Sequence, residues 1–146
     1  RNRSRDRIKA QIGLSRHCPI SYLEDCLSYF WGNKNFYSID LYGDEFAQPI
    51  ENFKGIYRRA KKEGLRLKAH VGEWGTAKDI RTAVEELELD EVQHGIAAAG
   101  DESVIRFLAE NKIRLNITPM SNVLLGRVAD MAEHPIGKLY RSGIDG

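Results

Sequence analysis

The sequence predicts an α/β fold in which short buried strands alternate with amphipathic helices. Five apolar segments of strand length occur, and each lies roughly 20–40 residues from the next, with a helical pattern between them. This spacing is typical of repeated β/α units with right-handed crossovers, which build a parallel sheet. The predicted strands are residues 8–14, 36–41, 65–69, 91–96 and 112–117.

The first unit joins an imperfectly alternating strand, residues 8–14, to a helix over residues 21–30. Ser21 is the expected N-cap of this helix, because Glu24 occupies the capping-box position three residues later. The apolar positions expected on one helix face are Leu23, Cys26, Leu27 and Phe30. This face is expected to pack against the sheet.

In the second unit, the apolar strand 36–41 stops shortly before Gly43, and a helix is predicted over residues 53–62. Gly64 fits the position just after the helix end, where a left-handed residue is favoured. Four basic residues lie on the outer face near the helix C-terminus, where the helix dipole favours positive charge. A nucleic-acid partner is not needed to explain them.

The third and fourth units follow the same plan. Strand 65–69 precedes a helix over residues 76–87 with Thr76 as the expected cap, and strand 91–96 precedes a helix over residues 102–110. Apolar side chains recur every three or four residues in both helices, as expected of helices with one buried face.

The last predicted strand, residues 112–117, ends at Thr118, and a short helix is expected over residues 136–141. Two architectures fit this alternation: an open doubly wound sheet, or part of a (β/α)₈ barrel, which needs about 250 residues when complete. No glycine-rich phosphate loop follows any predicted strand, so a dinucleotide-binding site is disfavoured.

Composition and charge exclude several classes of protein. With 146 residues, 42% hydrophobic and 29% charged, the chain has an ordinary globular composition, and its net charge of +1 argues against a dedicated nucleic-acid or membrane surface. Cys18 and Cys26 are too few for a disulfide framework and fit a reducing compartment. No segment is apolar enough to cross a bilayer or to act as a secretion signal. We therefore expect a cytoplasmic protein, and the sequence leaves a homo-oligomer open.

Polar residues follow the predicted strands at the points where the apolar runs stop. His70 and Glu73 come after the third strand, and His94 ends the fourth. Parallel strands would gather these side chains at one end of the sheet, where barrel enzymes carry their reacting groups. Imidazole can bind zinc and a nearby carboxyl group can move protons, so the pattern fits a catalytic site. By spacing alone, hydrogen-bonded structural histidines fit equally well.

Several motifs resemble those of the metal-dependent adenosine deaminases of the amidohydrolase superfamily. His70-Val71-Gly72-Glu73 is similar to that family's HxGE box, and Gln93-His94-Gly95 is similar to its GHG box. The further matches are Asp40-Leu41-Tyr42-Gly43-Asp44-Glu45 to DLxGDE, Pro119-Met120-Ser121-Asn122 with Gly126 to P-x-S-N-x-x-x-G, and His134-Pro135-Ile136 to HPI. The fold that this resemblance implies is a (β/α)₈ barrel.

The resemblance also implies roles for single residues. His70 would be a zinc ligand, and Glu73 would donate a proton to N1 of a purine ring. His94 would orient and deprotonate the zinc-bound water that attacks C6, and Gly43 would offer its backbone N–H to the ring. The implied reaction is hydrolytic deamination of adenosine or a related 6-aminopurine to the 6-oxo purine and ammonia. It would need one Zn²⁺ per complete site and a small-molecule purine as partner.

The family's HxH pair and DDP segment, which supply the other zinc ligands, do not occur in this sequence. The resemblance therefore implies that residues 1–146 are a single partial barrel domain that is inactive alone. We expect it to be poorly soluble in isolation, because sheet edges and an apolar barrel interior would be uncovered. Val71 and Gln93 depart from the usual residues of their boxes and leave the identity of the purine open. Two alternatives stay open: another hydrolase of the superfamily, and a catalytically dead barrel used for binding or assembly.

Overall fold

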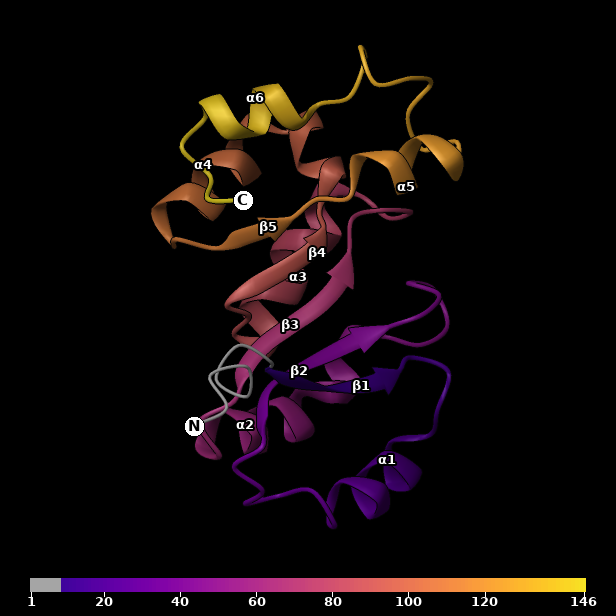
Figure 1. Ribbon diagram of the computed structural model, residues 1–146, viewed down its shortest axis with the longest axis vertical. Coiled ribbons are helices and arrows are strands. Elements are labelled where there is room, and N and C mark those ends of the chain that lie inside the picture. Colours follow the sequence, from indigo (N-terminus) through magenta and orange to yellow (C-terminus); the bar gives the residue numbers. More distant parts are fainter. Residues whose placement is uncertain (1–8) are drawn as a thin grey trace, which may run out of the picture.

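The computed structural model describes residues 9–146, and five parallel strands alternate with helices in this part of the chain (Figure 1). The strands are β1 (Ala10–Ser15), β2 (Phe36–Tyr42), β3 (Arg66–Val71), β4 (Glu91–His94) and β5 (Arg114–Asn116). They pair in the sequential order β1-β2-β3-β4-β5. A doubly wound sheet reverses its strand order at a switch point, whereas a barrel does not. The sequential strand order therefore identifies the sheet as part of a barrel and not as a doubly wound sheet. The described strands do not close the barrel.

Helices connect the strands as expected, with a few differences. The α-helices are α1 (Ile20–Leu27), α2 (Lys54–Lys62), α3 (Ala77–Leu87), α4 (Glu102–Glu110), α5 (Pro119–Leu124) and α6 (Ile136–Arg141), and the 3₁₀ helices are η2 (Ile50–Phe53) and η3 (Ile96–Gly100). The sequence-based prediction missed α5, which begins with a proline in its first turn, a favoured place for proline. The start of the first predicted strand, residue 8, lies outside the described residues.

One face of the sheet is apolar and is covered by the helices. A row of register partners crosses all five strands on this face: Leu14, Leu41, Ala69, Val92 and Leu115. All five are buried, and α2, α3 and α4 pack side by side behind the sheet (Figure 1). Burial of this row supplies the hydrophobic stabilisation that holds helices and sheet together.

The opposite face, which is the inner face of the partial barrel, is polar. Its row of register partners is Gly13, Asp40, Lys68, Glu91 and Arg114. Glu91 is buried, and its carboxylate pairs with Arg66, lies 3.3 Å from Lys68 Nζ and accepts a 2.7 Å hydrogen bond from Asn116. The expectation of an apolar interior is therefore wrong, because the inward positions of the strands carry charged and amide side chains.

Two predicted helix ends, at Thr76 and Gly64, agree with the structure, and one, at Ser21, does not. Thr76 caps α3 through a capping box with Asp79, and Gly64 (φ +77°) ends α2 in a left-handed turn, both as predicted. Ser21 is not the N-cap of α1. The helix begins one residue earlier, and its first hydrogen bond runs from Leu23 N–H to the carbonyl of Pro19.

The fourth strand is shorter than predicted. It ends at His94, and residues 96–100 form η3 rather than the end of a strand. His94 and Gly95 both have φ of +66°, and two successive left-handed residues turn the chain out of the sheet.

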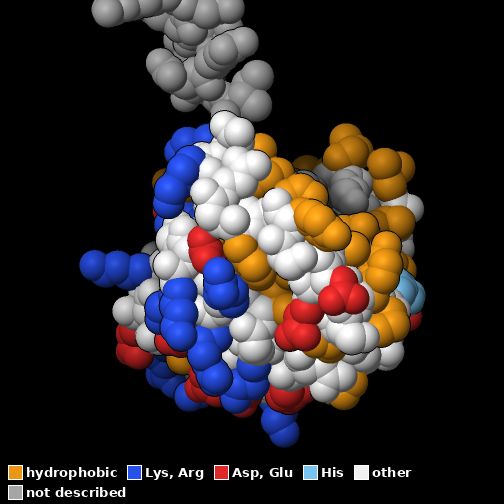
Figure 2. Space-filling view, turned by 90° about the horizontal axis from the view of Figure 1, so that it is seen from below, with side chains coloured by type: hydrophobic (Ala, Val, Ile, Leu, Met, Phe, Trp, Pro, Cys, Tyr) orange, Lys and Arg blue, Asp and Glu red, His pale blue; other side chains and the backbone are white. Residues whose placement is uncertain are grey.

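The surface near α1 and α2 is divided by side-chain type. Figure 2 shows Lys and Arg side chains gathered on the side where α2 lies, and hydrophobic side chains on the side of α1. The exposed basic residues of α2 are Arg58, Arg59, Lys61 and Lys62, as predicted, and α1 exposes Tyr22.

Within residues 9–146, no helix combines the length and the apolar character that a membrane crossing requires.

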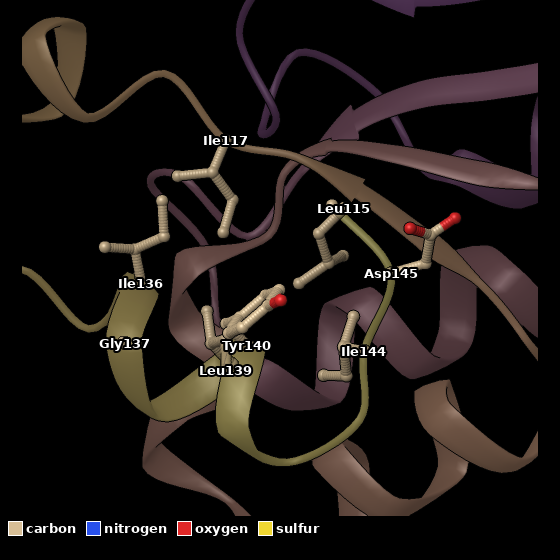
Figure 3. Close-up of a pocket in the computed structure, with 9 residues that line it drawn as sticks. Leu115, Ile117, Ile136, Gly137, Leu139, Tyr140, Ile144 and Asp145 are labelled. Atoms are coloured by element: carbon tan, nitrogen blue, oxygen red, sulfur yellow. The ribbon is translucent and has the colours of Figure 1, made fainter.

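A second apolar surface lies at the β5 edge of the sheet. Here β5, α6 and the last residues of the chain enclose a cavity of about 330 Å³ (Figure 3). Aliphatic side chains from all three segments face this cavity: Leu115, Ile117, Ile136, Leu139 and Ile144. None of the polar residues that end β2, β3 and β4 lines it, so it is separate from the candidate site.

Candidate functional site

The structure brings the predicted site residues to one end of the sheet. His70 lies near the end of β3, and His94 ends β4. Gly43 directly follows β2, and Glu73 lies two residues past the end of β3. Since the strands are parallel, these residues share the carboxyl edge. A cavity of about 520 Å³ opens there, lined by Tyr42, Gly43, Asp44, Glu45, Phe46, His70, Glu73 and Trp74. His94 does not line this cavity but contacts Glu73 and His70.

His70 is held by a buried carboxylate from the neighbouring strand. Its Nδ1 lies 3.2 Å from Asp40 Oδ2, and Asp40 is buried on the inner face of β2. Burial alone would lower the pKa of His70, but the hydrogen bond and charge of Asp40 outweigh burial and raise it. Because Asp40 engages Nδ1, Nε2 is the ring nitrogen left for a ligand, which is the usual arrangement behind a metal-binding histidine.

His94 and Glu73 form a second close pair. His94 Nδ1 lies 3.4 Å from Glu73 Oε1, and the His94 and His70 ring centroids are 5.3 Å apart. The pKa of His94 is lowered, chiefly because burial disfavours the imidazolium, although the charge of Glu73 opposes this effect. A neutral imidazole beside a carboxyl group can accept a proton while the carboxyl group donates one.

Glu45 fixes the loop that carries Glu73, a role that sequence reasoning missed. Its buried carboxylate accepts hydrogen bonds from four consecutive backbone N–H groups, those of residues 72–75, at 2.8–3.3 Å. Such charge-assisted bonds are among the stronger hydrogen bonds in proteins. The sequence signal was the carboxylate after Gly43, but its partner loop lies 27 or more residues away.

The segment after β5 adds further contacts that the sequence did not predict. Thr118 Oγ1 lies 3.1 Å from His94 Nδ1, and the amide of Asn122 contacts both Glu73 and His94. Arg127 donates a 2.7 Å hydrogen bond to the backbone carbonyl of Glu73 and lies over the ring of Trp74. Three successive strand ends therefore contribute to one cluster.

The cluster contains two imidazole side chains, His70 and His94, which are of the type that binds zinc. Among residues 9–146, no group of three or more His, Cys, Asp or Glu side chains is arranged to hold a metal ion. A catalytic zinc site needs three protein ligands. The described part of the chain therefore does not hold a complete zinc site by itself.

Parallel strands in sequential order, with a polar site at their carboxyl ends, define the chain as part of a (β/α)₈ barrel of the amidohydrolase type. The chain belongs to the adenosine deaminase family, whose family model matches residues 20–145.

Individual relatives agree with this assignment. A putative adenosine/adenine deaminase of Treponema pallidum is 45% identical over 134 residues, which cover 92% of this chain and 45% of the relative. The crystal structure of an adenine deaminase from Arthrobacter aurescens is 28% identical, with a TM-score of 0.82 over 93% of this chain and 42% of that one. A zinc-bound amidohydrolase from Burkholderia ambifaria shares the fold at 24% identity, with a TM-score of 0.78 over 90% of this chain and 38% of that one. The chain thus spans less than half the length of these proteins.

Proposed function

We propose that this chain is the central part of a complete barrel enzyme that hydrolytically deaminates adenine or adenosine to the 6-oxo purine and ammonia. The observation that carries the proposal is the contact of Glu73 with His94, beside His70 and at the cavity that Gly43 also lines. Membership of the adenosine deaminase family supports the same reaction.

Glu73, His94 and Gly43 each take one part of the proposed reaction. Glu73 donates a proton to N1 of the purine, which makes C6 electrophilic, while His94 orients the attacking water and takes its proton. His94 then passes that proton to the departing amino group, which leaves as ammonia. The hydroxyl proton left at C6 restores Glu73 as the 6-oxo group forms. Gly43, at the cavity wall, offers its backbone N–H to the ring.

His70 would hold zinc through Nε2, with Asp40 fixing the ring from behind. When bound, zinc supplies Lewis-acid activation, since it lowers the pKa of water to about 7. We propose that the remaining ligands come from barrel strands outside these 146 residues. In this arrangement Asp40 orients His70, and the aromatic rings of Phe46 and Trp74 line the cavity.

The test uses a full-length protein that contains this chain. Adenine, adenosine and AMP are each supplied, and the 6-oxo purine and ammonia are measured together with the zinc content. We expect equal amounts of both products from adenine or adenosine, loss of activity after chelation, and recovery with zinc. A zinc-loaded protein that converts neither adenine nor adenosine would contradict the proposal, and one that converts none of the three would favour a catalytically dead barrel.

A further inference from the structure

We propose that Asn122, held in place by His134, is a positioning residue that sets Glu73 against His94, an inference that rests on the function proposed above. Both residues belong to sequence motifs, P-x-S-N and HPI, to which the proposed reaction gives no role. The structure places them in direct contact with each other and with the site.

Asn122 lies between the two groups that move protons. Its side chain is completely buried on α5, and Nδ2 lies 3.2 Å from Glu73 Oε1 and 3.4 Å from His94 Nδ1. Asn122 follows β5, Glu73 follows β3 and His94 ends β4, so a single amide links three strand ends. A buried amide of this kind holds one geometry, because leaving its polar atoms unpaired would cost about 1–3 kcal/mol.

His134 determines which way the amide points. The backbone N–H of Ile136 donates to His134 Nδ1 at 3.1 Å, so this nitrogen is an acceptor. A neutral imidazole then carries its proton on Nε2, which lies 3.2 Å from Asn122 Oδ1. Asn122 Oδ1 therefore accepts from His134, and Nδ2 must face Glu73 and His94. Burial lowers the pKa of His134, which favours the neutral form that this chain of hydrogen bonds requires.

The two carboxyl oxygens of Glu73 therefore have different roles. Oε1 accepts the hydrogen bond from Asn122, which leaves Oε2 as the oxygen that carries the proton for the purine. Thr118 Oγ1, at 3.1 Å from His94 Nδ1, can either donate or accept. It can therefore satisfy this nitrogen whether His94 is neutral or protonated.

The main test is Asn122→Ala in the full-length, zinc-loaded protein. A positioning role predicts that kcat falls roughly 10- to 100-fold, the equivalent of one lost hydrogen bond to a charged group, while KM changes less than about 3-fold. Zinc content should stay the same. Asn111→Ala is the matched control, because Asn111 is exposed at the end of α4 and bonds to the carbonyl of Phe107.

His134 is tested by a pair of variants. His134→Phe keeps a ring but removes the donor to Asn122, so kcat should fall as in Asn122→Ala. His134→Gln retains an N–H donor near the place of Nε2 and should keep most of the activity. The double variant Asn122→Ala/His134→Phe should be no slower than Asn122→Ala, since both changes break one chain of contacts.

The inference is overturned if Asn122→Ala keeps kcat within about 2-fold of the unaltered protein. Should Asn122→Ala fail to fold, equal kcat values in His134→Phe and His134→Gln would overturn it instead. An unaltered protein that deaminates no 6-aminopurine would overturn the proposed function itself. Failure of the function and failure of the positioning role are therefore distinguishable.

Discussion

Gly72 is the residue on which the shape of the catalytic loop depends most directly. It adopts φ of +73°, and its N–H is the first of the four that bind Glu45. A Cβ built at this position would lie 2.4 Å from two side-chain atoms of Ile80. The residue before Glu73 is therefore restricted to glycine by both its backbone angle and its neighbours.

Gly72→Ala should destabilise the full-length protein by about 2–4 kcal/mol, from left-handed strain and overpacking together. Gly64→Ala is the matched control, because Gly64 has nearly the same φ (+77°) but would meet no atom within 4 Å. It should cost only about 1–2 kcal/mol. Urea unfolding of both variants measures the difference. Equal losses of unfolding free energy would contradict the packing argument.

Single residues of the site were predictable to different degrees. His70, Glu73 and His94 could be singled out because reactive side chains stood just after apolar runs. Glu45 and Asn122 could not be given roles, because their partners lie 27 to 49 residues away in the sequence. Only the fold brings these groups within hydrogen-bond distance.

At the scale of secondary-structure elements, the two faces of the sheet differ in how well the sequence predicts them. The apolar face was predictable from runs such as Ile39 and Leu41, but the interleaved Ser38 and Asp40 were not recognised as an inward-facing polar set. Buried polar side chains are stable here because they satisfy one another, as Glu91 does with Arg66 and Asn116. Helix α5 was missed because its one buried residue, Asn122, is polar, so no apolar face marks this helix in the sequence.

The Glu91 cluster should make stability depend on pH. Burial would raise the pKa of Glu91, but its hydrogen bonds to Arg66, Asn116 and Lys68 outweigh burial and lower it. A lowered pKa in the folded state stabilises the protein above the ordinary glutamate pKa, and this contribution is lost as pH falls through the folded value.

Glu91→Gln should therefore reduce the unfolding free energy of the full-length protein by about 2 kcal/mol at pH 7. The gap to the unaltered protein should close below about pH 4. Glu85→Gln, which removes an exposed pair with Arg81, is the control and should change stability by less than about 0.5 kcal/mol. Denaturant titrations from pH 7 to pH 3 measure the gap, and a constant gap would contradict this account.

For the whole molecule, the open edges of the sheet matter most. Residues 144–146 already lie beside β5, where Leu115 N–H donates to the carbonyl of Asp145 at 2.9 Å. This hydrogen bond places residues 144–146 along the free edge of β5. The apolar cavity of Figure 3 lies at this same edge, where further barrel elements would pack.

We expect the isolated 146-residue chain to self-associate, since β1 lies at an edge of the sheet and Ile136 and Tyr140 are exposed on α6 at the β5 side. Of the two causes expected from the sequence, the open sheet edges remain, whereas the inner face is polar and does not contribute. Light scattering and thermal melting compare the isolated chain with the full-length protein. A monomeric chain that melts cooperatively would contradict this expectation.

The central claim is that Glu73 donates a proton in the deamination of a 6-aminopurine. The most direct measurement is ammonia release by Glu73→Gln in the full-length, zinc-loaded protein, with Glu85→Gln as an exposed control on α3. We predict a fall in kcat of about 10²- to 10⁴-fold for Glu73→Gln, with zinc content and unfolding free energy unchanged, and no fall for the control. Glu73→Gln that releases ammonia at the rate of the unaltered protein would contradict the account.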